Sequence, residues 1–206
     1  AVRTPYPTIR FPSGAKKRFS HLQYDKDVHQ WQGAQIVLIA FDELAHFSSQ
    51  QFFYMLSRNR STCGVKPYVR ATCNPDADSW LAKFIQWWWD EDTGYPIPER
   101  SGVIRYFVRV GDNIIWGDSK AEIVREHPEI NKEWIKSFTF IASKLSDNKI
   151  LMEKDPGYLG NLMAQSEVER ERLLHGNWKI RPAAGKYFKR SNFEIVDVIP
   201  NKVEAW

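Results

Sequence analysis

The strongest indication of the fold is the segment Gln35-Ile-Val-Leu-Ile-Ala-Phe-Asp-Glu43. Its apolar run, from Ile36 to Phe41, is continuous rather than alternating. Such a run is typical of a strand that is buried on both faces in the middle of a parallel sheet. The run ends abruptly in the carboxylates of Asp42 and Glu43. The segment therefore predicts an interior strand with an acidic carboxyl end.

A helix and a second strand follow this segment. Ser48 and Gln51 have the spacing of a capping box, and apolar residues recur behind them at helical intervals, so we expect a helix at about 49–58. A strand over 68–72 then stops at Cys73-Asn74-Pro75, because proline cannot continue regular pairing. The order of strand, acidic turn, helix, strand and polar turn predicts an α/β domain with a mainly parallel sheet flanked by helices.

The same order predicts where the polar ends of the two strands lie. A helix of this length is sufficient for a crossover connection, and crossovers between parallel strands are right-handed. If the two strands are neighbours, Asn74 comes within reach of Glu43 at one edge of the sheet. That edge is where open α/β sheets bind ligands.

The flanking regions show weaker patterns. Upstream, two short strands at 8–11 and 17–22 surround a glycine-containing turn, and a short helix covers 25–33. Downstream, we expect a helix at 80–89, a strand at 103–110, a helix at 118–126, a strand at 137–142 and a helix at 157–174, and a β pattern restarts at 185–188 and 193–196. The three tryptophans Trp87, Trp88 and Trp89 can stack on bases or pack against a neighbouring domain.

Composition excludes several classes of protein. The 206 residues are 43% hydrophobic and 26% charged, values of a packed globular chain rather than a disordered or fibrous one. The longest apolar stretch has the length of a strand, so we expect no membrane span. The two cysteines are too few for a disulfide framework, and the five histidines have no metal-ligand spacing.

The charge of the chain is unevenly distributed. With 29 Lys and Arg against 25 Asp and Glu, the net charge is +4, and residues 1–33 hold all of the excess with six basic and two acidic residues. A short basic stretch of this kind can meet phosphates, but a solvated hairpin face explains it equally well.

The residues after the two strands suggest nucleoside-triphosphate chemistry. In that chemistry an aspartate such as Asp42 holds the magnesium shell, and a glutamate such as Glu43 orients the attacking water. The alternative is that the acidic pair only caps the strand or leads into the next helix.

Other polar residues are candidates for contacting the same phosphate. Thr72 and Asn74 can hydrogen-bond the terminal phosphate or the water, although Cys73-Asn74-Pro75 also has the composition of an ordinary turn. Arg58 and Arg60 can sense a phosphate, but the helix dipole also favours arginine at a helix C-terminus. No phosphate-loop motif is present, and Ser13-Gly14-Ala15-Lys16 does not match it.

Seven segments in a fixed order resemble the large terminase subunit of tailed phages and prophages, over about residues 19–190. They are Phe19-Ser-His-Leu22, Gln32-Gly33-Ala34, Ile-Ala-Phe-Asp-Glu-Leu-Ala-His-Phe47, Ser57-Arg-Asn-Arg-Ser-Thr62, Ala-Thr-Cys-Asn-Pro75, Phe140-Ile-Ala-Ser-Lys-Leu-Ser-Asp-Asn148 and Arg172-Leu-Leu-His-Gly-Asn-Trp178.

The resemblance implies a partial P-loop NTPase-like fold and an ATPase. It implies that Asp42 and Glu43 are the Walker B pair, with Asp42 at the metal and Glu43 catalytic, and that Thr72-Cys73-Asn74 is the coupling motif. It also implies ATP and Mg²⁺ as cofactors. The implied partners are double-stranded DNA, the small terminase subunit, the portal protein and further copies of the chain in a ring. The implied location is the host cytoplasm, away from membranes.

Departures from the family pattern define the expected domain organisation. The family's phosphate loop and nuclease carboxylates are not in the printed chain. We therefore expect the later half of the motor domain: a partial ATPase domain at 1–142, a helical linker region at 143–184 and the start of a nuclease domain at 185–206. The alternative functions are a helicase-like translocase and a non-catalytic remnant or DNA-binding module.

Overall fold

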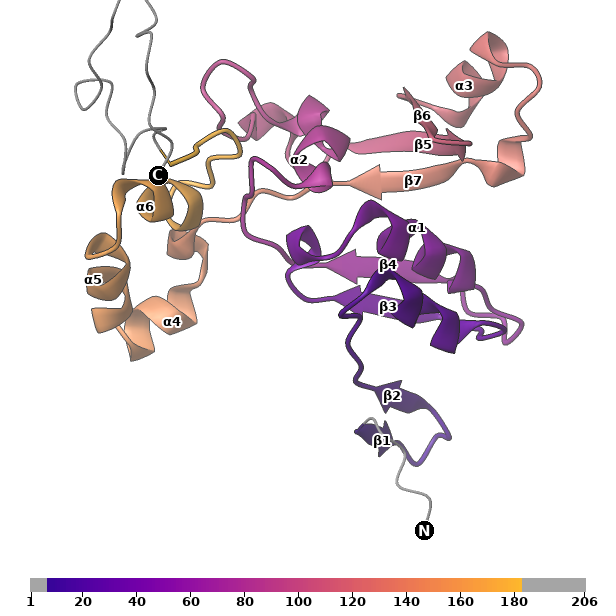
Figure 1. Cartoon of the computed structure of the whole chain (residues 1–206), viewed down its shortest axis with the longest axis horizontal. Helices are drawn as coiled ribbons and strands as arrows, with labels where there is room; N and C mark the ends of the chain where they lie inside the picture. The colour runs from indigo at the N-terminus through magenta and orange to yellow at the C-terminus, as the bar shows by residue number, and fades with distance from the viewer. Residues whose placement is uncertain (1–6, 183–206) are drawn as a thin grey trace, which may run out of the picture.

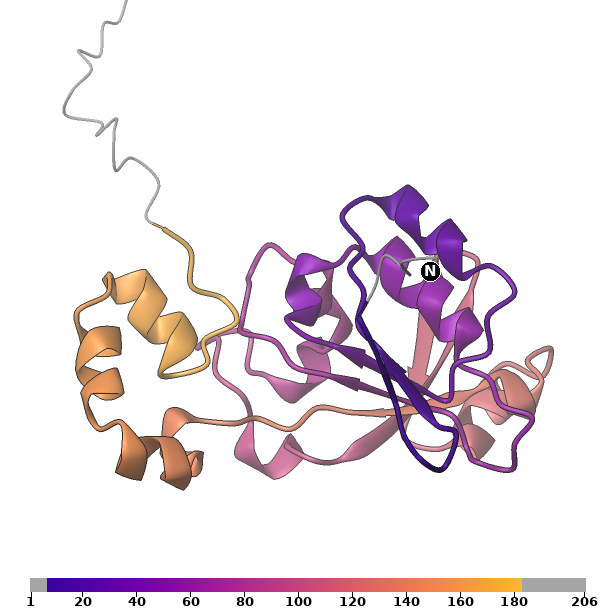
Figure 2. The same cartoon turned by 90° about the horizontal axis from the view of Figure 1, so that it is seen from below.

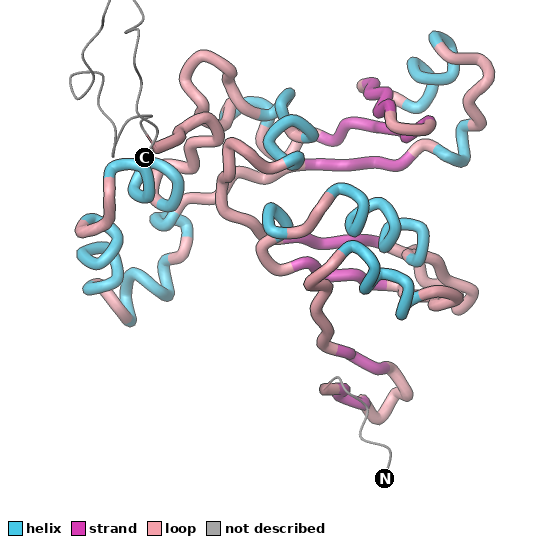
Figure 3. Tube along the Cα trace, viewed as in Figure 1, coloured by secondary structure: helices cyan, strands magenta, loops and turns pink. Residues whose placement is uncertain are grey.

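A computed structural model of the chain describes residues 7–182 and has a mixed α/β architecture (Figure 1). The strands are β1 Thr8–Arg10, β2 Lys16–Arg18, β3 Leu38–Phe41, β4 Tyr68–Ala71, β5 Ile104–Val110, β6 Asn113–Gly117 and β7 Lys136–Thr139. The α-helices are α1 Ser49–Arg58, α2 Trp80–Phe84, α3 Lys120–Glu126, α4 Lys149–Lys154, α5 Gly157–Met163 and α6 Glu167–Leu173. Short 3₁₀ turns and long loops connect them (Figure 3).

Strands β3 and β4 form the predicted parallel pair. Leu38 pairs with Tyr68 at one end and Phe41 pairs with Ala71 at the other. The connection between them contains α1, whose predicted bounds are confirmed. The predicted capping box is confirmed as well.

The α1 cap satisfies two backbone donors at the start of the helix. The Gln51 amide donates to the Ser48 hydroxyl over 3.1 Å, and the Ser48 amide donates to the Gln51 side chain over 3.0 Å. These donors have no partner inside the helix, so the reciprocal bonds fix its first residue.

The expectation that β3 is buried on both faces is wrong. Ile39 and Phe41 are buried under α1, whereas the side chain of Leu38 is 45% exposed and Ala40 is also exposed. The two faces of β3 are therefore unequally covered. A continuous apolar run therefore indicated a strand but not how many of its faces are covered.

The expectation of a mainly parallel sheet is also wrong. Within the described residues, β3 and β4 make the parallel sheet, and a separate three-stranded sheet in the order β6-β5-β7 is antiparallel throughout. The sequence patterns had indicated β5 and β7 but not β6. Gly111 and Asp112 form the two-residue turn between β5 and β6, with Gly111 at a φ of 62°. Such a turn makes the following strand antiparallel.

Phe84 joins the two sheets in one aromatic core. Its ring centroid lies 6.2 Å from that of Phe52 on α1, 5.4 Å from that of Phe107 on β5 and 5.1 Å from that of Phe138 on β7. Phe84 is 6% exposed. A smaller cluster of Val108, Ile123, Ile130 and Ile135 fixes α3 to the antiparallel sheet.

The tryptophan run is divided between core and surface. Trp88 is 1% exposed and donates from its indole to the carbonyl oxygen of Val103 over 3.3 Å. The helix expected at 80–89 ends at Phe84 and is followed by the 3₁₀ turn Gln86–Trp88. Trp88 therefore packs inside this chain, and not against a neighbouring domain.

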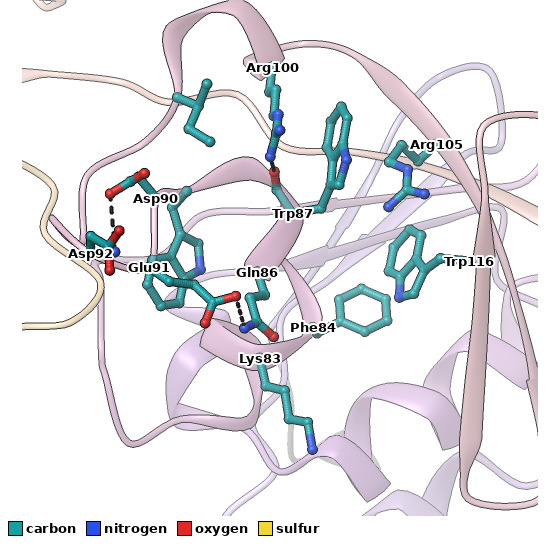
Figure 4. Close-up of a pocket in the computed structure, with 12 residues that line it drawn as sticks. Lys83, Phe84, Gln86, Trp87, Asp90, Glu91, Asp92, Arg100, Arg105 and Trp116 are labelled. Atoms are coloured by element: carbon teal, nitrogen blue, oxygen red, sulfur yellow. Dashed lines mark hydrogen bonds between the residues drawn. The ribbon is translucent and has the colours of Figure 1, made fainter.

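Trp87 lines a surface cleft of about 580 Å³ (Figure 4). In the close-up its ring lies between Arg100 and Arg105, whose guanidinium carbons are 4.7 and 4.8 Å from the ring centroid. Arg100 also donates to the Trp87 carbonyl oxygen over 2.8 Å, and Arg105 pairs with Asp118 over 2.8 Å. The ring is thus engaged in two cation–π contacts, which compete with stacking on a base.

Two further groups of elements project from this core. The predicted hairpin is confirmed as β1 and β2, an antiparallel pair whose residues are all exposed. Helices α4, α5 and α6 form a separate group at the other side of the molecule (Figure 2). The single helix expected at 157–174 is broken, because the Ser166 hydroxyl accepts from the Glu169 amide and caps a new helix.

The predictions for the C-terminal residues concern segments outside the described range. The β pattern at 185–188 and 193–196, and with it the start of a nuclease domain at 185–206, lies outside residues 7–182. Across the described part of the chain, no helix combines the length and the apolar character that a membrane crossing needs.

Candidate functional site

The candidate site lies where β3 and β4 end at the same edge of the parallel pair. Beyond the strands the two backbones stay hydrogen-bonded: the Thr72 amide donates to the carbonyl oxygen of Phe41 over 3.0 Å, and the Leu44 amide donates to that of Thr72 over 2.8 Å. Leu44 is 3% exposed and anchors this end in the core. The predicted juxtaposition of the two polar strand ends is confirmed.

Asp42 and Glu43 are each held by a side chain that follows β4. The Thr72 hydroxyl donates to Asp42 Oδ1 over 2.7 Å. Asn74 holds both oxygens of Glu43, because its side-chain amide donates to Oε1 over 3.1 Å and its backbone amide donates to Oε2 over 3.2 Å. The four residues therefore form two fixed pairs rather than a set of free side chains.

Glu43 has an unusual backbone conformation. Its φ of 56° and ψ of 58° lie in the left-handed region, and it is the one non-glycine residue with positive φ among residues 7–182. This conformation is costly for a residue with a Cβ, and such strain concentrates at functional sites. It turns the chain at the end of β3 so that Leu44 enters the core while the Glu43 carboxylate meets Asn74.

The structure does not bring Arg58 and Arg60 to this edge. The carbonyl oxygen of Arg58 accepts from the Ile36 amide over 3.0 Å, and the Arg60 guanidinium donates to the carbonyl oxygens of Gly33 and Ala34. These contacts lie at the amino end of β3, about 20 Å of extended chain away from Asp42. We assign the two arginines no role in sensing a phosphate at the carboxylates.

The site fits a magnesium ion that accompanies a nucleotide. Mg²⁺ uses one or two carboxylates together with waters and substrate phosphates, rather than a cage made of protein alone. Asp42 is exposed, and its fixed carboxylate offers oxygens of the required kind. Within residues 7–182 no group of three or more His, Cys, Asp or Glu side chains is arranged to hold a metal.

A family model described as "Terminase large subunit, T4likevirus-type, N-terminal" matches residues 1–195. The chain belongs to this family. Its role therefore lies in phage DNA packaging, and large terminase subunits are generally ATPases. No curated protein and no solved structure matches the chain.

The match bears on the expected domain organisation of the terminase chain. It runs through the expected boundary at residue 185 and reaches residue 195. The expectation that the chain is the later half of the ATPase domain is not confirmed by it. The boundaries at 142 and 184 stay predictions.

Sequence reasoning missed the residues that hold the Asn74 turn of the terminase chain in place. Arg172 on α6 donates from Nε to the carbonyl oxygen of Pro75 over 2.8 Å, and Arg181 pairs with Asp78 over 2.7 Å. Both contacts span about 100 residues of sequence. Because arginines are common on exposed helices, nothing in the local pattern around Arg172 indicated this contact.

The two cysteines of the terminase chain differ in their acidity. Burial, together with the smaller effect of the negative charge of Glu43, raises the pKa of the Cys73 thiol to about 11. A hydrogen bond with Ser61 lowers the pKa of the exposed Cys63 thiol. Cys73 is therefore a chemical probe of the candidate site.

We predict that iodoacetamide alkylates Cys63 about a hundredfold faster than Cys73 at pH 8, because the thiolate is the nucleophile and a pKa near 11 leaves about one thiolate in a thousand. Peptide mass spectrometry gives both rates. The Cys73 rate should rise about tenfold per pH unit up to pH 11, and Glu43→Gln should increase it by removing a negative charge. Equal rates for the two thiols at pH 8 would contradict the placement of Cys73.

Proposed function

We propose that this chain is part of the ATP-driven motor that packages double-stranded viral DNA into capsids, with its hydrolytic carboxylates at Asp42 and Glu43. The observation that carries the proposal is the pairing of Glu43 with Asn74 beside the pairing of Asp42 with Thr72, at the carboxyl edge of two parallel strands. Family membership supports it, since large terminase subunits are generally ATPases.

Within this proposal the four side chains have separate tasks. A magnesium ion bound with ATP would supply charge neutralisation at the phosphates. Asp42 would hold that ion, and Thr72 keeps the Asp42 carboxylate in one orientation through its hydroxyl. Glu43 accepts a proton from the attacking water as general base.

Asn74 orients Glu43 for this task. Each Glu43 oxygen accepts one hydrogen bond from Asn74, and a carboxylate oxygen keeps a second lone pair for a water hydrogen. Since Asn74 contacts Glu43 through both its backbone and its side chain, a movement of the Asn74 turn changes the direction of the carboxylate. This is the physical basis on which we propose that Thr72, Cys73 and Asn74 couple hydrolysis to movement of DNA.

The proposed assembly follows from the same function. The chain would act in a ring of identical subunits around double-stranded DNA, together with the small terminase subunit and the portal protein, in the host cytoplasm. The protein that contains it would also cut DNA with a nuclease domain.

We predict that the 206-residue polypeptide by itself releases phosphate from ATP at the rate of a buffer control. Its sequence contains no motif Gly-x₄-Gly-Lys-Ser/Thr to surround the phosphates, although Asp42 and Glu43 are in place. Phosphate release is measured with Mg²⁺, with the Glu43→Gln variant as the matched control. Turnover that this substitution abolishes would show that the chain builds a phosphate site that its sequence does not reveal.

A further inference from the structure

The turn that contains Asn74 is held from outside the sheet. Pro75 follows Asn74 directly and is buried, and its carbonyl oxygen accepts a hydrogen bond from Arg172 Nε over 2.8 Å. The group that Arg172 contacts and the groups that contact Glu43 therefore belong to adjacent residues. Between the Pro75 carbonyl and Asn74 lie the planar Asn74–Pro75 peptide unit and the φ angle of Pro75, which its ring fixes, so few torsions separate the two groups.

Arg172 is itself fixed in a way that suits this contact. Its side chain is 28% exposed, and its NH1 group pairs with Glu169 one turn earlier on α6 over 2.9 Å. The carboxylate of Glu169 holds the planar guanidinium in one orientation, which leaves Nε directed at Pro75. Since this hydrogen bond comes from a charged donor, it is stronger than a bond between neutral groups.

The Asn74 turn and α6 line the same cleft. The cleft has a volume of about 770 Å³, and its lining includes residues 73–75, 143–144 and 171–173. The segment that follows α6 has a separate contact with the rest of the molecule, because the Trp178 amide donates to the Gly94 carbonyl oxygen over 2.7 Å. The hydrogen bond from Arg172 to Pro75 is thus a direct contact between α6 and the Asn74 turn beside this cleft.

We propose that Arg172 is a positioning residue that sets Asn74, and through it the Glu43 carboxylate, according to the position of helix α6. The importance of this link for hydrolysis rests on the function proposed above, whereas the link itself does not. In this arrangement a displacement of α6 redirects Glu43 without any contact between α6 and the nucleotide.

The first test uses amide exchange in the 206-residue chain, measured by NMR. Arg172→Ala should speed exchange of the Asn74 amide, which donates to Glu43, by about fivefold to tenfold, the change expected for one weakened hydrogen bond. The Leu44 amide, which donates to Thr72, should keep its rate. A merely stabilising role for Arg172 would change both rates together, and that result, or no change at Asn74, would overturn the proposal.

Arg170→Ala is the matched control. Arg170 is on the same helix, and its guanidinium donates to the Met163 carbonyl oxygen within the helical group. The Arg170→Ala substitution should leave the exchange rate of the Asn74 amide unchanged. If Arg172→Ala does not fold, Arg172→Lys serves in its place, and it should give a smaller increase at Asn74 because it keeps the charge but loses the planar fork.

The second test uses a large terminase subunit that contains this segment and hydrolyses ATP. Arg172→Ala should lower kcat by about tenfold and leave KM for ATP unchanged, since Arg172 orients the base without contacting the nucleotide. If Glu43→Gln abolishes hydrolysis but Arg172→Ala leaves kcat unchanged, this inference fails and the proposed function stands. If Glu43→Gln itself leaves hydrolysis intact, the proposed function fails.

Discussion

Replacing Glu43 by Gln in a large terminase subunit that contains this segment and a phosphate loop should lower ATP hydrolysis by a factor of about 10²–10⁴ while nucleotide binding is kept. Gln preserves the shape of the side chain and can still meet Asn74, but it cannot accept the proton of the attacking water. Steady-state phosphate release and binding of a fluorescent nucleotide measure the two properties separately.

Asp42→Asn is the contrasting variant for this experiment. It keeps the hydrogen bond from the Thr72 hydroxyl but loses the charge at the metal, so it should weaken the magnesium-dependent part of nucleotide binding. The two variants therefore distinguish the role of Glu43 as the base from the role of Asp42 as the metal ligand. Normal hydrolysis in both would show that neither carboxylate has the assigned role.

Gly94→Ala should lower the free energy of unfolding of the 206-residue chain by about 2–5 kcal/mol, the sum of backbone strain and overpacking. Gly94 has a φ of 83°, and a Cβ there would meet the Asn177 side-chain oxygen and lie 2.7 Å from Lys179 Cβ. Asn177 cannot move without loss, because that oxygen accepts from the amides of Lys179 and Ile180, each over 2.9 Å. Urea denaturation followed by tryptophan fluorescence measures the effect.

Gly102→Ala is the matched control for Gly94→Ala. Gly102 has nearly the same φ, 81°, but a Cβ there would have no atom within 4 Å. Gly102→Ala should lower the free energy of unfolding by the backbone strain alone, about 1–2 kcal/mol. Equal losses for the two variants would show that the close packing of Gly94 against Asn177 does not contribute to stability.

The part of the site that could be predicted from sequence depends on strong local signals. The run from Ile36 to Phe41, the capping box at Ser48 and the break at Pro75 each identify an element or its end from a few neighbouring residues. The rule for crossovers then places Asn74 beside Glu43, which the structure confirms. The chemical roles of these residues stay predictions.

The rest depended on contacts that local patterns do not encode. The burial of a strand face is decided by what packs on it, and so the exposure of Leu38 could not be read from its apolar neighbours. The strand β6 contains Asn113 and Gly117 at its ends, which weakens its β pattern. Helix α1 runs away from Asp42 and ends at the opposite edge of the sheet. Arg58 and Arg60 therefore lie at that edge.

The ring of Phe84 limits which parts of the chain can move separately. Sliding β3 and β4 past β5 and β7 would separate Phe84 from Phe52, Phe107 and Phe138, at about 0.5–1.5 kcal/mol for each ring pair beyond the lost burial. These ring contacts therefore oppose separate movement of the two sheets. In the motor that we propose, a movement of the Glu43 carboxylate would reach the rest of the molecule through the Asn74 turn, with α6 as the element that is displaced.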